Sequence, residues 1–388
     1  MNGRTRMLAA VLALAGTQVA MADVKVGFLG TLTGPSADVG RDQLDGFGLA
    51  LEQLGNKLGG VGVVLVKEDD QQKPEAALGG VSKLLDKEKV DVVVGLTFAN
   101  TLMAIQPRIA STDVPFIGTV AGPSPTAGAQ CKANLFITSW NSDVPAEAVG
   151  KYMTDKGIKR ISTLTPNFVG GKDKIAGLKR YYKGEIVDEM YTPLAQLDFS
   201  AELTQVANSR PDAVFTFYPG GLGVSFVRQY GQAGLIGKIP FYSTNTIEGT
   251  AVEAMGSAAI GAIVADTWTP GTANPQSKQF VAAFEKRFGR TPSAYAAFSF
   301  DAAMLLDAAV RATGGNVADR KALAKAIASA PFKSVRGAFR FGPNNYPVQN
   351  YHVFQIAKSA SGKPEFRLLA ENVLTSHADA YVAQCGLK

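Results

Sequence analysis

Histidine and cysteine are scarce in this sequence, with two residues of each among 388. His352 and His377 do not stand at the spacing to Cys131 and Cys385 that a zinc site needs. The chain also lacks a G-x-S-x-G nucleophile motif, a G-x-x-x-x-G-K-[ST] phosphate loop and a G-x-G-x-x-G motif after its first predicted strand. These absences argue against an enzyme and predict a protein that uses neither metal nor cofactor.

Long basic runs and long apolar segments are lacking as well. The 39 Lys and Arg are interspersed with 33 Asp and Glu, so no basic stripe for nucleic acid forms despite a net charge of +6. The apolar stretch at residues 7–16 is about half the length needed to cross a bilayer. It follows Arg4 and Arg6 and precedes a small-residue exit at Ala22. Residues 1–22 therefore predict a signal peptide, and with it an exported protein.

The two cysteines gain meaning from this predicted export. In an oxidising compartment Cys131 and Cys385 are able to pair, which would tie the C-terminal tail to the first half of the chain. Two unrelated thiols are the alternative. We expect the disulfide.

Short apolar runs alternate with amphipathic helical patterns along most of the chain, which predicts parallel sheets covered on both faces. The first set has strands at residues 24–29, 61–66, 90–94 and 114–117, and a similar second set spans residues 145–242. Residues 277–288, 294–313 and 319–328 predict helices, and residues 335–341 and 349–356 alternate like antiparallel strands. The fold class is therefore α/β, with two doubly wound lobes.

Irregular segments near residues 140, 267 and 345 predict that the chain crosses between the lobes three times. We expect an N-terminal lobe of residues 23–140 with 268–345, a C-terminal lobe of residues 141–267 with 346–370, and a tail of residues 371–388. No short repeat is present.

In open α/β sheets, ligands bind at the carboxyl ends of the strands. The loops there are rich in glycine, hydroxyl and amide groups in the first set, including Thr33 and Asn100. Asn100 stands where a helix begins, so it serves either as a simple N-cap or in a carboxylate site. The second set offers larger groups, among them Asn167, Phe168 and Tyr218. Such a mixture suits a small ligand with an apolar body.

Several segments in order resemble one family. They are F-L-G-T-L-T-G-P at residues 28–35, V-V-G at 93–95 leading into F-A-N at 98–100, V-P-F-I at 114–117, and residues 212–221. Together they resemble the periplasmic solute-binding proteins of ABC importers, in the leucine/isoleucine/valine-binding branch. The resemblance implies a type I, Venus-flytrap fold with three hinge crossings, a monomer in the periplasm, and an ABC permease in the inner membrane as partner.

The resemblance also implies site residues. Asn100 with Ala99 corresponds to the carboxylate-binding position, and Glu248 to the acid that pairs with an amino group, although Asn245 is an alternative there. The other implied ligand-binding positions are Val39, Thr119, Ala121, Phe168 and Tyr218.

Departures from the family pattern bear on the ligand. Ala121 and Phe168 reduce the polar contacts available to an α-amino group, while Phe98 and Tyr218 add aromatic surface. Residues 215–221 look most like the subgroup that takes up benzoates and phenylpropanoids. An aromatic carboxylate is therefore the expected ligand, with branched-chain or aromatic amino acids as the alternative. Arg41 would add positive charge at the cleft or serve only on the surface. A sensory ligand-binding module is a more remote reading.

Overall fold

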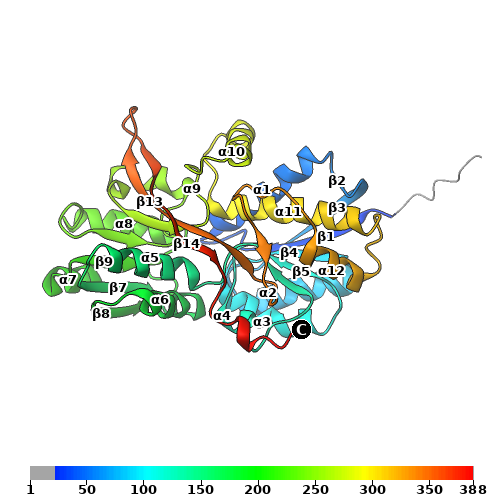
Figure 1. The fold of residues 1–388 in the computed structure, drawn as a ribbon, viewed down its shortest axis with the longest axis horizontal. Coiled ribbons are helices and arrows are strands. Elements are labelled where there is room, and N and C mark those ends of the chain that lie inside the picture. The colour runs from blue at the N-terminus through cyan, green and yellow to red at the C-terminus, as the bar shows by residue number, and fades with distance from the viewer. Residues whose placement is uncertain (1–21, 388) are drawn as a thin grey trace, which may run out of the picture.

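A computed structural model describes residues 22–387 of the chain, so the predicted signal peptide lies outside the described residues except for Ala22. Two β-sheets occupy the two halves of an elongated molecule, and helices cover both of them (Figure 1). Among the described residues, no helix combines the length and the apolar character that crossing a membrane requires.

The first sheet has six strands in the order β2-β3-β1-β4-β5-β6. All pairs are parallel except β2 with β3. The central strand β1 is buried except for Lys25, as expected for a strand covered on both faces. The strands are β1 (Val24–Gly30), β2 (Lys57–Leu58), β3 (Val61–Asp69), β4 (Val92–Gly95), β5 (Phe116–Gly118) and β6 (Leu135–Ile137).

The second sheet follows the order β12-β13-β11-β10-β9-β7-β8, with β14 paired to β13. Its strands β7 to β11 pair parallel with one another, whereas β13 pairs antiparallel with β11, β12 and β14. The strands are β7 (Arg160–Pro166), β8 (Glu185–Thr192), β9 (Ala213–Thr216), β10 (Phe241–Ser243), β11 (Ile263–Asp266), β12 (Arg340–Phe341), β13 (Pro347–Lys358) and β14 (Pro364–His377).

Helices connect most of these strands. They are α1 (Ala37–Gln53), α2 (Pro74–Ser82) with a π-helical turn at Lys83–Lys87, α3 (Ala99–Ala110), α4 (Ser124–Ala127), α5 (Val144–Asp155), α6 (Val169–Tyr181), α7 (Ser200–Ser209), α8 (Gly221–Gln232), α9 (Gly249–Met255), α10 (Pro275–Phe288), α11 (Ala294–Ala312) and α12 (Arg320–Ser329), with short 3-10 turns at Gly256–Ala259 and Val382–Gln384.

Helix α11 is buried along most of its length and packs closely against α1. A Cβ atom added at Gly46 of α1 would lie 2.1 Å from the carbonyl oxygen of Ala296, so only glycine allows this approach. The result is a rigid pair of helices that brings the start of α11, far away in sequence, to the carboxyl edge of the first sheet.

The predicted α/β class and two-sheet architecture are confirmed, with differences at the ends of elements. The segment predicted as a strand at residues 335–341 is extended only over β12, because Val335 and Arg336 instead bind the buried carboxylate of Asp301. The short strands β6 and β11 and the long strand β14 were not predicted. The expected disulfide is present: Cys131 and Cys385 are bonded, with their Cα atoms 5.6 Å apart.

The chain leaves the first sheet after β6 and returns after β11 to α10, which packs against α1. Arg336 lies where these passages meet, because it donates to the carbonyl oxygens of Thr138 and Ser139 and to the side chain of Gln349. The lobe boundaries themselves stay a prediction. The predicted tail boundary at residue 371 lies inside β14.

Candidate functional site

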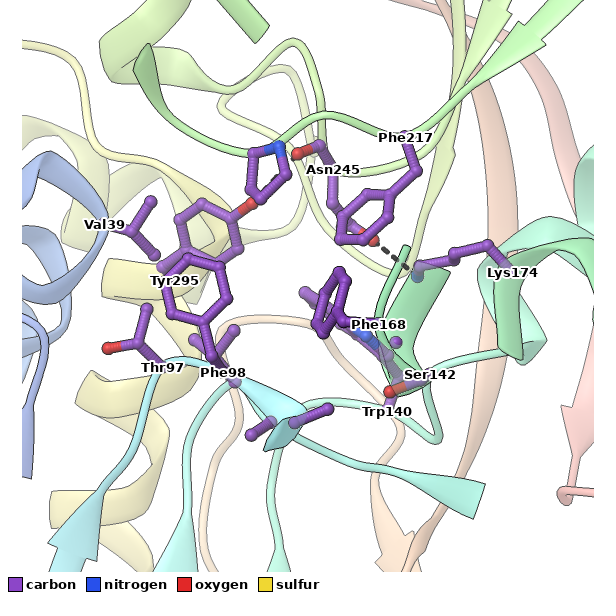
Figure 2. A pocket seen from close by; sticks show the side chains of 15 residues that line it. Val39, Thr97, Phe98, Trp140, Ser142, Phe168, Lys174, Phe217, Asn245 and Tyr295 are labelled. Atoms are coloured by element: carbon purple, nitrogen blue, oxygen red, sulfur yellow. Dashed lines mark hydrogen bonds between the residues drawn. The ribbon is translucent and has the colours of Figure 1, made fainter. Parts of the chain in front are cut away.

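A cavity lies where the carboxyl ends of strands from both sheets face each other. It is partly open to solvent, and the space between atoms in it, open solvent included, is about 430 Å³. The ends of six strands contribute to it, those of β4, β5, β6, β7, β9 and β10, together with α1, α3, α6 and α11. Its lining consists of Val39, Thr97, Phe98, Ala99, Val120, Ala121, Trp140, Ser142, Phe168, Gly170, Lys174, Phe217, Pro219, Asn245 and Tyr295 (Figure 2).

Aromatic rings make up much of the cavity wall. The ring centroids of Phe98 and Phe168 are 6.3 Å apart, and those of Phe168 and Phe217 are 6.2 Å apart. Trp140 and Tyr295 form a further pair at 6.4 Å. All three distances fall in the range in which aromatic rings attract each other. A flat apolar group placed among these rings would contact several ring faces and edges at once.

Lys174 brings a positive charge to this aromatic wall. The residue is 2% exposed, and its Nζ donates a hydrogen bond of 2.8 Å to Oδ1 of Asn245. Nζ also lies 5.4 Å from the centre of the Trp140 ring and 5.2 Å from that of Phe217, within the range of cation–π attraction. Figure 2 shows the ammonium at one side of the cavity with its hydrogen bond to Asn245.

Two buried acids stand behind Asn245 and Lys174. Asn245 donates through Nδ2 to Oδ2 of Asp266 at 2.8 Å, and Glu248 accepts a hydrogen bond of 3.2 Å from the backbone N–H of Ala294. Neither acid belongs to the cavity lining. The chain of contacts from Lys174 through Asn245 to Asp266 connects α6, the loop after β10 and the end of β11.

Burial dominates the protonation of this group, because removing a charge from water disfavours the charged form. It lowers the pKa of Lys174 to about 7, against the opposing pull of nearby acids such as Asp266. It raises the pKa of Asp266 to about 6. Burial, reinforced by the neighbouring Asp266, raises the pKa of Glu248 well above its usual range. Near neutral pH the group therefore gains or loses protons readily.

Six of the predicted site residues meet in the cavity lining. They are Val39, Phe98, Ala99, Ala121, Phe168 and Asn245. Asn245, given as an alternative to Glu248, is therefore the one of the two that lines the cavity.

Four other predicted residues lie outside the cavity lining, Thr33 and Asn167 in loops, Arg41 in α1 and Asn100 in α3. Thr33, Arg41 and Asn167 are exposed, and the hydroxyl of Thr33 donates to Asp69 at 2.6 Å. Asn100 is the second residue of α3, and its buried Oδ1 has no hydrogen-bond partner among the described residues. None of the four contributes to the lining.

Three more predicted residues serve the surrounding structure. Thr119 accepts a hydrogen bond of 2.7 Å from Gln43. Tyr218 packs its ring between Phe199 and Phe226, with centroids 4.8 and 5.0 Å away, and shares a 3.1 Å hydrogen bond with Thr192. Glu248 binds the first N–H of α11, as described above. Tyr218 points into the core of the second sheet because its neighbour Phe217 takes the cavity side.

Nine lining residues were not predicted as site residues, for identifiable reasons. Trp140 and Ser142 follow β6, a strand too short to show in the pattern. Tyr295 comes from α11, about 150 residues beyond the first-sheet loops. Lys174 could have been singled out from the sequence, because it is a charged residue on the same buried face of α6 as Leu178. The remaining ones are Thr97, Val120, Gly170, Phe217 and Pro219.

Known proteins match this chain over most of its length. A family model described as periplasmic binding protein matches residues 23–363. The Leu/Ile/Val-binding protein homolog 6 of Brucella melitensis is 26% identical over 364 residues, which cover 91% of this chain and 92% of that protein.

Solved structures are similar as well. A solute-binding protein of an ABC transporter from R. palustris, in complex with benzoate, is 31% identical with a TM-score of 0.88, over 94% of this chain and all of that one. A second, from Rhodopseudomonas palustris BisB5 in complex with 3,4-dihydroxybenzoic acid, is 27% identical with a TM-score of 0.87, over 92% of this chain and 99% of that one. With the family model spanning both sheets and the cavity between them, the chain belongs to the periplasmic binding protein family.

Proposed function

We propose that this protein is the extracytoplasmic solute receptor of an ABC transporter and that it binds a small aromatic carboxylate in the cavity between its lobes. The observation that carries the proposal is the lining of five aromatic side chains around the cavity. Ligand pockets of this kind combine mostly apolar walls with a few placed polar groups.

The wall chemistry favours a ring over a branched aliphatic side chain. Phe98, Phe168 and Phe217 form a continuous series of ring contacts at 6.2–6.3 Å, which an inserted aromatic ring would extend with the same geometry. The relatives bound to benzoate and to 3,4-dihydroxybenzoic acid support the same ligand class.

The two-lobed architecture supports transport without chemistry. Binding between lobes allows hinge closure around a ligand, and closure alone suffices to present the ligand to a membrane permease. We infer export through the signal peptide predicted at residues 1–22, action in the periplasm as a monomer, and no catalytic step.

A calorimetric titration tests the proposal. Protein that has been unfolded, dialysed and refolded is titrated with benzoate, 4-hydroxybenzoate, leucine and phenylalanine. We expect micromolar or tighter binding of the benzoates and much weaker binding of both amino acids.

The names of the relatives are the reason for including amino acids in the titration. Six of them are named Leu/Ile/Val-binding protein homologs, so a branched-chain amino acid is the second candidate ligand. Tight binding of leucine with no heat from either benzoate would replace the proposed ligand class by that one. Binding of none of the four compounds would refute both.

A further inference from the structure

One ionisable side chain stands apart in the cavity lining. Of the fifteen lining residues, Lys174 alone carries a formal charge. Its ammonium has three N–H donors. Within residues 22–387, the side chain of Lys174 makes one hydrogen bond, from Nζ to Oδ1 of Asn245. Two donors are therefore available to an acceptor placed in the cavity.

The nearby acids are turned away from the same cavity. Both oxygens of Asp266 are engaged, Oδ2 by Asn245 at 2.8 Å and Oδ1 by the backbone N–H of Thr267 at 2.6 Å. Glu248 is held by the N–H of Ala294. Because Asn245 presents its carbonyl oxygen to Lys174 and its amide to Asp266, it separates Asp266 from the cavity, and no acid belongs to the cavity lining. A ligand ammonium would find a cation at the wall and no carboxylate.

We propose that Lys174 determines the specificity of the site, by pairing with the carboxylate of the ligand and by excluding ligands that carry an ammonium group beside it. This inference rests on the proposed function and deepens it, since it names the group that separates aromatic acids from α-amino acids. The two classes share a carboxylate and differ by one positive charge. A buried cation distinguishes them through like-charge repulsion at short range.

Below about pH 7, where Lys174 is mainly charged, its setting makes this discrimination strong. The side chain is 2% exposed and lies between the rings of Trp140 and Phe217, so little solvent screens its charge. Hydrogen bonds between a buried ammonium and a carboxylate are among the strong ones. The rings that contact the apolar part of the ligand thus also exclude solvent from Lys174, which increases the difference in binding free energy between aromatic acids and α-amino acids.

Three variants test the inference. Lys174→Met removes the charge but keeps the length of the side chain, and Lys174→Arg keeps the charge. The matched control is Lys172→Met, an exposed lysine on the same helix. Calorimetric titrations with benzoate and with its uncharged analogue benzamide are run for each protein, after circular dichroism and thermal unfolding confirm that it is folded.

We expect Lys174→Met to weaken benzoate binding at least about tenfold and to leave benzamide binding within about twofold of the unmodified protein. Lys174→Arg should retain benzoate binding better than the Met variant, and Lys172→Met should bind like the unmodified protein. Phenylalanine should bind better to the Met variant than to the unmodified protein, because the repulsive charge is gone.

Two results would overturn the inference. One is equal weakening of benzoate and benzamide in a folded Lys174→Met protein, which would mean that Lys174 acts by packing alone. The other is unchanged benzoate affinity in that variant. Either result leaves the proposed function standing as long as the unmodified protein binds benzoate, whereas failure of the unmodified protein to bind any aromatic acid removes both.

Discussion

Benzoate affinity should fall as the pH rises through neutrality, and the size of the fall follows from the buried lysine. The perturbation is pH alone, from 6 to 8. Burial places the pKa of Lys174 at about 7, so the ammonium is about 90% protonated at pH 6 and about 10% protonated at pH 8. Benzoate stays ionised over this range. A bound carboxylate stabilises the ammonium and raises the pKa of Lys174 in the complex. Binding then requires proton uptake above pH 7, and the affinity falls about tenfold between pH 6 and pH 8.

The acids that face Lys174 act in the same direction. Asp266, Asp143, Asp173 and Glu248 all interact with its charge, and the pKa of Asp266 is raised to about 6 by burial. As these acids ionise with rising pH, their negative charges oppose the binding of the benzoate anion. Their contribution also lowers benzoate affinity at high pH, so the sign of the prediction does not depend on which group titrates first.

Calorimetry in two buffers with different ionisation enthalpies measures the proton uptake directly. At pH 8 we expect close to one proton taken up per benzoate bound, and fewer at pH 6. The Lys174→Arg variant is the control, because a guanidinium stays charged throughout and only the contribution of the acids remains. Equal proton uptake in both proteins, or affinity that does not change from pH 6 to pH 8, would refute the reasoning.

Three further predictions concern the wall, the tail and the crossing point. Phe217→Ala removes a cavity ring and should weaken benzoate binding about fivefold or more in a titration, while thermal unfolding tests whether the fold is kept. Replacing both Cys131 and Cys385 by serine opens a link across 254 residues, so urea unfolding should show a loss of about 2–5 kcal/mol; an unchanged midpoint would contradict this. Arg336→Met leaves the buried Asp301 without its cation and should lower the free energy of unfolding by about 3–5 kcal/mol, with Asp301→Asn in the same chain restoring part of the loss.

Most of the fold was predictable from local patterns. Strands that are buried on both faces give continuous apolar runs, and the covering helices give stripes at three- and four-residue spacing, so β1, β4 and α10 were expected close to their observed bounds. Strand β14 was not, because it lies at the edge of the second sheet with most of its side chains exposed or half-buried and carries little apolar alternation. Pattern alone describes covered strands better than edge strands.

The sequence predicted which loops surround the candidate site better than it predicted which side chains line it. The rule that ligands bind at strand ends pointed to the loops after β1, β4, β5, β7, β9 and β10, and all of them except the loop after β1 contribute to the cavity. It did not say which of two neighbouring side chains turns inward. Phe217 and Tyr218 follow one another directly after β9, and Phe217 lines the cavity while Tyr218 packs against Phe199 in the core.

Lys174 shows what a sequence pattern could still have revealed about the site. The buried face of α6 contains Gly170, Gly171, Lys174 and Leu178, and a lysine in such a face has no reason to be there for packing alone. Burying an ammonium is costly unless a partner offsets the cost, and the structure supplies one acceptor, Asn245, where the ammonium is able to donate three hydrogen bonds. A buried, under-coordinated cation facing a cavity is in general a place where an anion binds. The search for such sites therefore has to include the apolar stripe of each helix as well as the polar loops, since the charge that selects the ligand is found among the residues that would otherwise be assigned to the core.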